Sequence, residues 1–203
     1  MGGLTISSDA LPVSRETLIE RYFPNRIVEI GLYAQFLAEQ GALRGLIGPR
    51  EGERIWERHI FNSLPVISLI PLNAEVIDIG SGAGLPGIPI ALARPDIRMT
   101  LIEPLQRRVD FLNEAVAGLE ITVFHGRAQD CKKSADVVTA RAVAPFEKLK
   151  KMGWHLVKKG GYLLAIKGES ADTEAAGTER AQVLEIESEG LPLGRVISIQ
   201  KSA

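Results

Sequence analysis

The chain has 203 residues, of which 45% are hydrophobic and 24% are charged, and its formal net charge is −1. These values are typical of one globular α/β protein and exclude a multidomain assembly, a collagen-like chain and a disordered chain. The chain has no apolar run of about 18 residues and no signal-peptide pattern at its start, so we expect a cytoplasmic protein without a membrane helix.

Cysteine and charge patterns narrow the possible partners. Cys131 is the one cysteine of the sequence and the three histidines are scattered, so we expect neither a disulfide nor a metal. Residues 127–167 contain ten basic and three acidic side chains, whereas residues 168–190 contain seven acidic side chains and one basic. The basic block is a candidate phosphate-binding face, and a solvated helix surface is the alternative.

Helical signals fill the first seventy residues. Ser14 is a candidate N-cap for a helix that ends before Pro24, and apolar spacing predicts a second helix over 27–41. A third apolar stretch, 55–70, is interrupted by Pro65, and we expect Trp56 to pack within it. Residues 1–71 are therefore expected to form an N-terminal helical cap on the main domain, which spans residues 72–203.

From Glu75 onward, short β-branched runs alternate with helical stretches, which is typical of a parallel sheet with crossover helices. The predicted strands are 76–79, 98–103, 121–125, 135–140, 162–166, 183–186 and 195–200. The predicted helices lie near 87–93, 105–118, 145–157 and 171–182. A Gly/Pro loop joins the last two strands, which indicates a terminal antiparallel hairpin. The fold class is α/β, with a Rossmann-like sheet and helices on both faces.

A glycine-rich turn follows the first predicted strand. Three residues match the G-x-G-x-x-G pattern of phosphate-binding loops: Gly82, Gly84 and Gly87. Asp78, at the strand end, would repel a pyrophosphate, and Pro86 lacks an amide hydrogen. S-adenosylmethionine has no phosphate and carries an ammonium and a sulfonium, so an acid beside the loop favours it over a dinucleotide, which is the alternative.

Glu103 ends the next predicted strand, 25 positions after Asp78. An acid at this position can accept hydrogen bonds from both hydroxyls of a ribose. Dinucleotides and S-adenosylmethionine both contain that ribose, so Glu103 indicates an adenosine ligand without choosing between them. A solvated acid after a strand is the alternative.

The chain resembles the RsmG family, also called GidB, whose members methylate N7 of a guanosine in 16S ribosomal RNA of the small ribosomal subunit. The matching segments are 48–51, 56–59, 82–89 (GAGLPGIP), 111–112, 126–128, 141–144 (RAVA) and 167–168. The resemblance implies a class I methyltransferase domain over 72–203, S-adenosylmethionine as the cofactor, and 16S rRNA or the small subunit as the partner. We expect a monomer.

The resemblance also implies individual roles. Gly80 and Leu85 would line the methionine and ribose side of the cofactor, Ala128 and Gln129 would lie beside the adenine, and Arg141 would stand at the transfer site. The expected cofactor-binding residues are completed by Asp78, Gly82, Gly84 and Glu103. Gln129 replaces the family's Glu but keeps a carbonyl acceptor for the adenine amino group, and Asn62 stands where many relatives carry an acid.

Guanine N7 has a lone pair and no proton, so its methylation requires positioning rather than a general base. Arg141 is the expected catalytic residue, because its forked donors can bind guanine O6, an RNA phosphate or the cofactor carboxylate; a structural salt bridge is the alternative. Candidate RNA contacts are Arg127, Lys167 and His59, with exposed cations and a packed histidine as the alternatives.

Two other functions are compatible with these sequence patterns. The first is a small-molecule methyltransferase, because enzymes of the same fold methylate many different kinds of substrate. The second is a non-catalytic RNA-binding module in which the glycine loop is structural. Binding of S-adenosylmethionine distinguishes the second from either enzyme.

Overall fold

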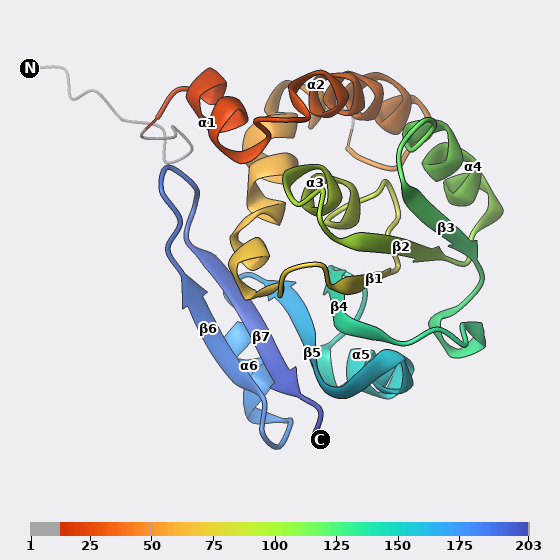
Figure 1. The fold of residues 1–203 in the computed structure, drawn as a ribbon, viewed down its shortest axis with the longest axis vertical. Helices are drawn as coiled ribbons and strands as arrows, with labels where there is room; N and C mark the ends of the chain where they lie inside the picture. Colours follow the sequence, from red (N-terminus) through yellow and green to blue (C-terminus); the bar gives the residue numbers. More distant parts are fainter. Residues whose placement is uncertain (1–12, 49, 203) are drawn as a thin grey trace, which may run out of the picture.

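The computed structural model describes residues 13–48 and 50–202, in which a seven-stranded sheet has the order β3-β2-β1-β4-β5-β7-β6 (Figure 1). The strands are β1 (Glu75–Ile79), β2 (Arg98–Glu103), β3 (Ile121–His125), β4 (Ala135–Arg141), β5 (Val157–Lys167), β6 (Gln182–Ile186) and β7 (Gly194–Gln200). The first five are parallel, and β7 is antiparallel to both β5 and β6. The predicted parallel sheet and terminal hairpin are confirmed.

Six α-helices surround this sheet in the described residues. They are α1 (Arg15–Tyr22), α2 (Ile27–Phe36), α3 (Gly87–Ala93), α4 (Gln106–Ala115), α5 (Phe146–Gly153) and α6 (Ala171–Ala176). Ser14 caps α1 as predicted, since its Oγ accepts a hydrogen bond from the Thr17 amide. The helix predicted over 171–182 is too long, because α6 ends at Ala176 and β6 begins at Gln182.

The interrupted apolar stretch over 55–70 forms a series of short 3-10 and π turns rather than α-helix. These turns are Gly52–Arg54, Trp56–Ile60, Phe61–Ser63 and Pro65–Leu69. The side chains of Asn62 and Ser63 donate to the carbonyl oxygens four residues earlier, and Pro65 has no amide hydrogen to continue a helix. Trp56 packs against Phe61, as expected for a residue of a packed cap.

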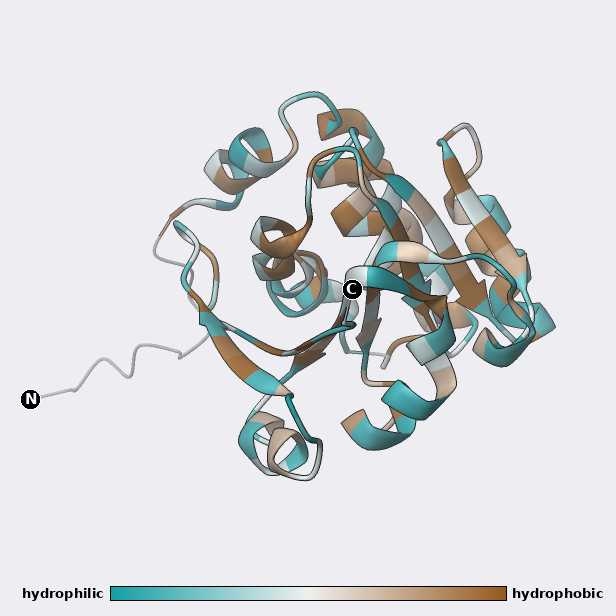
Figure 2. Cartoon of the chain, turned by 60° about the horizontal axis from the view of Figure 1, so that its bottom comes forward, coloured by the Kyte–Doolittle hydropathy of each residue, from teal (hydrophilic) through white to brown (hydrophobic). Residues whose placement is uncertain are grey.

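Successive strand residues enter two cores on opposite faces of the sheet, as the alternation of a pleated strand requires. One core joins the sheet to the N-terminal helices, α3 and α4, and includes Leu18, Ile30, Phe61, Val76, Leu101 and Val137. The other joins it to α5 and α6 and includes Ile77, Val138, Phe146, Leu163 and Ala175. Hydrophobic segments line the interior in Figure 2. The N-terminal helices therefore share a buried core with the sheet.

Candidate active site

The carboxyl ends of β1 and β4 meet at the point where the strand order reverses, which is where open α/β sheets bind ligands. The glycine loop follows β1, Glu103 ends β2 and Arg141 ends β4. The fold therefore brings together three of the regions that the sequence singled out.

Close packing explains the glycines of the loop. Gly80 has φ +67°, and a Cβ there would lie 2.8 Å from a methyl carbon of Val143. Gly84 has φ +94°, and a Cβ there would lie 2.3 Å from Ile88 Cδ1. Any larger residue would have to move the loop after β4 or the start of α3, so these glycines let the chain turn tightly. Leu85, in the same loop, is buried.

Asp78 lies beneath the loop rather than open to solvent. Its carboxylate is fully buried and accepts hydrogen bonds from Thr139 Oγ1 at 3.2 Å and from the Gly87 amide at 3.3 Å. Asp78 and Thr139 are paired in register on β1 and β4, which explains their contact. Burial raises the pKa of Asp78 to about 7, against the lowering effects of its hydrogen bonds and of Arg141. In the structure its oxygens hold the loop to the sheet.

Glu103 holds the upper part of the loop. It is 1% exposed, and its Oε2 accepts a hydrogen bond from the Gly82 amide at 3.0 Å while Oε1 accepts one from the Leu105 amide at 3.0 Å. Arg108 lies 3.8 Å from Oε2. The alternative of a solvated acid is wrong, because the carboxylate is enclosed at the glycine loop.

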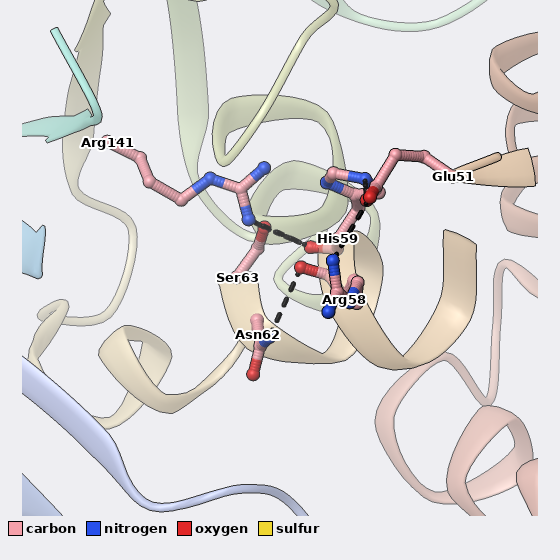
Figure 3. A network of polar contacts seen from close by, with 6 residues as sticks. All are labelled: Glu51, Arg58, His59, Asn62, Ser63 and Arg141. Atoms are coloured by element: carbon pink, nitrogen blue, oxygen red, sulfur yellow. Dashed lines mark hydrogen bonds and ion pairs between the residues drawn. The ribbon is translucent and has the colours of Figure 1, made fainter. Parts of the chain in front are cut away.

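Arg141 is fixed from the N-terminal segment. Its Nη1 donates to the His59 carbonyl oxygen at 3.2 Å and to Ser63 Oγ at 3.3 Å (Figure 3). No carboxylate forms an ion pair with it among the described residues, so the structural salt bridge considered as its alternative is absent there. Burial lowers the pKa of Arg141, while Tyr33 and Asp78 act in the opposite direction.

His59 joins the same network through its ring. Its Nε2 donates to Glu51 Oε2 at 2.9 Å, and the other oxygen of Glu51 accepts from Arg58 at 3.1 Å (Figure 3). Burial, followed by the charge of Arg141, lowers the pKa of His59, although Glu51 raises it. A neutral, hydrogen-bonded ring is the state that these surroundings favour. Its part in RNA binding stays a prediction.

A cleft of about 680 Å³ collects several predicted residues at this edge of the sheet. Its lining includes Arg141, His59, Lys167, Arg58 and Asn62. Lys167 is not a free cation, because its Nζ forms a 2.7 Å ion pair with Glu174 and donates to the Ala144 carbonyl oxygen at 2.9 Å. It ties α6 to the loop after β4 and so supports the position of Arg141.

The residues after β3 lie in a different setting. Arg127 is exposed and does not line this cleft, and its amide donates to Asp130. Ala128 is buried and Gln129 is exposed, and they follow a strand whose His125 pairs with Glu103. Their contacts with an adenine, and that of Arg127 with RNA, stay predictions.

The basic block does not form one continuous face. Arg141 and Lys167 lie at the carboxyl edge of the sheet, whereas Lys133 and Lys158 line a cleft of about 810 Å³ at the opposite edge. The lysines of α5 lie on the helix that covers the second core. Lys158 is also paired with Asp136. Crossover connections therefore divide the block between separate parts of the molecule, and phosphate binding by any of these parts stays a prediction.

Sequence reasoning missed the contacts that reach the site from the N-terminal segment. Tyr33, on α2, donates to the Ala83 carbonyl oxygen of the glycine loop at 2.9 Å. Ser63 accepts from Arg141, and Glu51 holds His59. The one available signal was the matched segments 48–51 and 56–59, which contain Glu51 and His59.

Two negative findings concern the described residues. No three His, Cys, Asp or Glu side chains there are close enough together to hold a metal ion. No helix within 13–48 or 50–202 has the length and hydropathy needed to cross a membrane.

Residues 26–193 match the GidB family, described as rRNA small subunit methyltransferase G. A ribosomal RNA small subunit methyltransferase G of Thermobifida fusca is 56% identical over 149 residues, which are 70% of this chain and 62% of that protein. One of Mycolicibacterium smegmatis is 52% identical over 159 residues, 75% of this chain and 68% of that protein. The chain therefore spans less than two thirds of the first relative's length.

Solved structures of low sequence identity share the fold. A methyltransferase of Pyrococcus furiosus superposes with a TM-score of 0.56 at 9% identity, covering 69% of this chain and 81% of its own. A ribosomal protein L11 methylase of Lactobacillus delbrueckii subsp. bulgaricus has a TM-score of 0.53 at 16% identity, covering 69% and 77%. The predicted Rossmann-like methyltransferase architecture is confirmed.

Proposed function

The chain belongs to the GidB family, and from this membership we propose that it transfers a methyl group from S-adenosylmethionine to guanine N7 of 16S rRNA in the small ribosomal subunit. One observation carries the proposal. The family match covers residues 26–193, and the fold gathers the glycine loop, Glu103 and Arg141 from this range at one edge of the sheet. The small-subunit relatives support the choice of RNA as the acceptor.

The residues at the loop fit S-adenosylmethionine. Among the described residues, a Cβ at Gly82 would meet only the Gly80 carbonyl oxygen, at the ordinary contact distance of 3.8 Å, so this side of the loop is not tightly packed. Asp78 and Glu103 place two buried carboxyl groups against the loop, which favours a ligand with cationic groups over a pyrophosphate. Bound S-adenosylmethionine supplies an electrophilic methyl group.

Each expected cofactor residue has a chemical part in this proposal. Glu103 would accept hydrogen bonds from the ribose hydroxyls in place of the one that it accepts from the Gly82 amide. Gly80, Gly82 and Gly84 would admit the methionine end, and Leu85 would cover the ribose. Ala128 and Gln129 would lie beside the adenine.

The acceptor requires placement and no base, because N7 carries no proton. Methylation makes the guanine ring cationic, so a cation placed against N7 itself would oppose the reaction. Arg141 therefore serves best at O6, at a neighbouring phosphate or at the cofactor carboxylate. Its fixed guanidinium limits the orientations of the bound group.

Transfer of labelled methyl groups tests the proposal. We expect S-adenosylmethionine to label the RNA of small ribosomal subunits, with large subunits as the control acceptor. Label in protein or in a small metabolite would contradict the RNA assignment. A specific cofactor at about a hundred times its Kd should stabilise the fold by about 2.7 kcal/mol, and no shift would indicate the non-catalytic module.

A further inference from the structure

Neutral groups hold one edge of the Arg141 guanidinium. Its Nη1 reaches the His59 carbonyl oxygen and Ser63 Oγ, which lie 82 and 78 positions earlier in the chain. Neither acceptor carries a charge, and no ion pair to Arg141 forms within the described residues. The arrangement orients the cation without neutralising it, unlike a buried salt bridge.

The hydroxyl of Ser63 is committed as an acceptor toward Arg141. Ser63 has one hydroxyl proton, and it is donated to the His59 carbonyl oxygen at 2.7 Å. The side chain is completely buried. Its lone pairs therefore remain for Arg141, and the three groups form a closed ring of hydrogen bonds. This ring directs the Nη1 protons toward the protein.

The other edge of the guanidinium is available. Nε and Nη2 carry three N–H bonds and have no hydrogen-bond partner among the described residues. Arg141 lines the 680 Å³ cleft, so these donors are available to a ligand bound there. A planar pair of donors with a full charge suits a ligand oxygen that is anionic or strongly polarised. The protein thus holds one edge and leaves the other for a ligand.

We propose that Ser63 is a positioning residue for the methyl transfer, which fixes the guanidinium of Arg141 so that its Nε and Nη2 edge faces the cleft with the charge preserved. This inference rests on the proposed function. Ser63 touches neither cofactor nor RNA in this account and acts through Arg141. A carboxylate in its place would orient Arg141 but would neutralise the charge that the ligand needs.

Ser63→Ala tests the proposal, with Ser68→Ala as its matched control. Ser68 lies in the next turn, donates to the Pro65 carbonyl oxygen at 3.2 Å, and is not among the described hydrogen-bond partners of Arg141. We expect Ser63→Ala to lower kcat/KM for methyl transfer by about tenfold, the effect of one hydrogen bond to a charged group. Ser68→Ala should stay within about twofold of wild type. Equal activities of the two variants would overturn the proposal.

A double-mutant cycle separates positioning from general structural support. In an Arg141→Lys background the fork is gone, so Ser63→Ala should cost less than about twofold. The same tenfold loss in both backgrounds would show that Ser63 acts independently of Arg141, and would contradict the proposal.

Binding and spectroscopic measurements supply readouts besides turnover. Calorimetry of Ser63→Ala with S-adenosylmethionine and with a small-subunit RNA fragment should show weakened binding of one ligand, which identifies the partner of Arg141. Unchanged affinity for both ligands together with unchanged kcat/KM would contradict the role.

Nitrogen NMR follows the guanidinium directly. A held guanidinium gives separate Nη1 and Nη2 signals, and these should merge in Ser63→Ala as rotation becomes fast. Signals already merged in the wild type would overturn the inference even if methyl transfer occurs. Separate signals in a protein that methylates no RNA would instead refute only the proposed function.

Discussion

Asp78 is completely buried, and the hydrogen bonds of its carboxyl group join β1 to β4 and to the start of α3. Because burial raises its pKa to about 7, the native state holds a proton that the unfolded chain releases above its ordinary pKa near 4. The resulting stability is fully present below about pH 4 and is lost as the pH rises through about 7. The same residue that secures the glycine loop therefore makes the fold pH-sensitive.

Asp78→Asn should remove this dependence. We expect the free energy of unfolding of the wild type to fall relative to the variant by up to about 1.4 kcal/mol per pH unit between about pH 4 and 7, and to run parallel above that range. Denaturant titrations of both proteins at several pH values measure the difference. A constant difference across this range would show that the carboxyl group is ionised throughout.

Arg141→Lys keeps the positive charge and removes the planar fork. A single ammonium cannot hold His59 and Ser63 on one side while presenting two parallel donors on the other. We expect a folded protein whose methyl transfer is slower by the equivalent of about 1 to 3 kcal/mol, or roughly 5- to 150-fold. Arg98→Lys, exposed at the opposite end of the sheet, is the control. Full activity of Arg141→Lys would show that a diffuse charge suffices.

The N-terminal helix α2 reaches the glycine loop. Tyr33 is 2% exposed and its hydroxyl donates to the Ala83 carbonyl oxygen, while a Cβ on Gly84 would lie 3.3 Å from the same hydroxyl. The helix and the loop therefore pack as one unit. Loop geometry depends on an N-terminal helix as well as on the strand that precedes the loop.

Tyr33→Phe should loosen that connection. The change leaves the buried Ala83 carbonyl oxygen without this donor, so we expect a loss of about 1 kcal/mol in unfolding free energy and severalfold weaker binding of S-adenosylmethionine. As a control, Tyr22→Phe removes a bond of the same 2.9 Å length, to the Glu189 carbonyl oxygen, which is exposed and lies away from the loop. Calorimetry on both variants checks the result, and unchanged cofactor affinity in Tyr33→Phe would refute the role of α2.

Predictability differs between the two halves of the fold. β2 and β3 have the predicted bounds because alternating β-branched runs and the following turns are local signals. The division of residues 52–69 into short turns could not be predicted from apolar spacing. It depends on the side chains of Asn62 and Ser63, which donate hydrogen bonds to backbone carbonyl oxygens there. The end of α6 was likewise not predictable from composition, because residues with high helix propensity continue beyond Ala176.

The sequence locates the strand-end residues of the site but not the side chains that bind them. Asp78, Glu103 and Arg141 could be placed at the site because each lies within one position of the end of a predicted parallel strand. Tyr33, Ser63 and Thr139 each bind a site residue that lies 50 or more positions away, at Ala83, Arg141 and Asp78 respectively, so only the packed fold reveals these contacts. The dispersal of the basic block follows from the same cause, because charge along a chain does not specify how crossovers distribute it.

The proposed reaction methylates guanine at N7, so the decisive measurement is the position of the methyl group on the RNA. A methyl group on N7 makes the guanine ring reducible by borohydride, after which aniline breaks the RNA chain at that nucleotide. RNA from small subunits treated with this protein and S-adenosylmethionine should be cut at one guanosine, and untreated RNA should not. Labelled RNA that remains intact under this treatment would place the methyl group elsewhere and contradict the account.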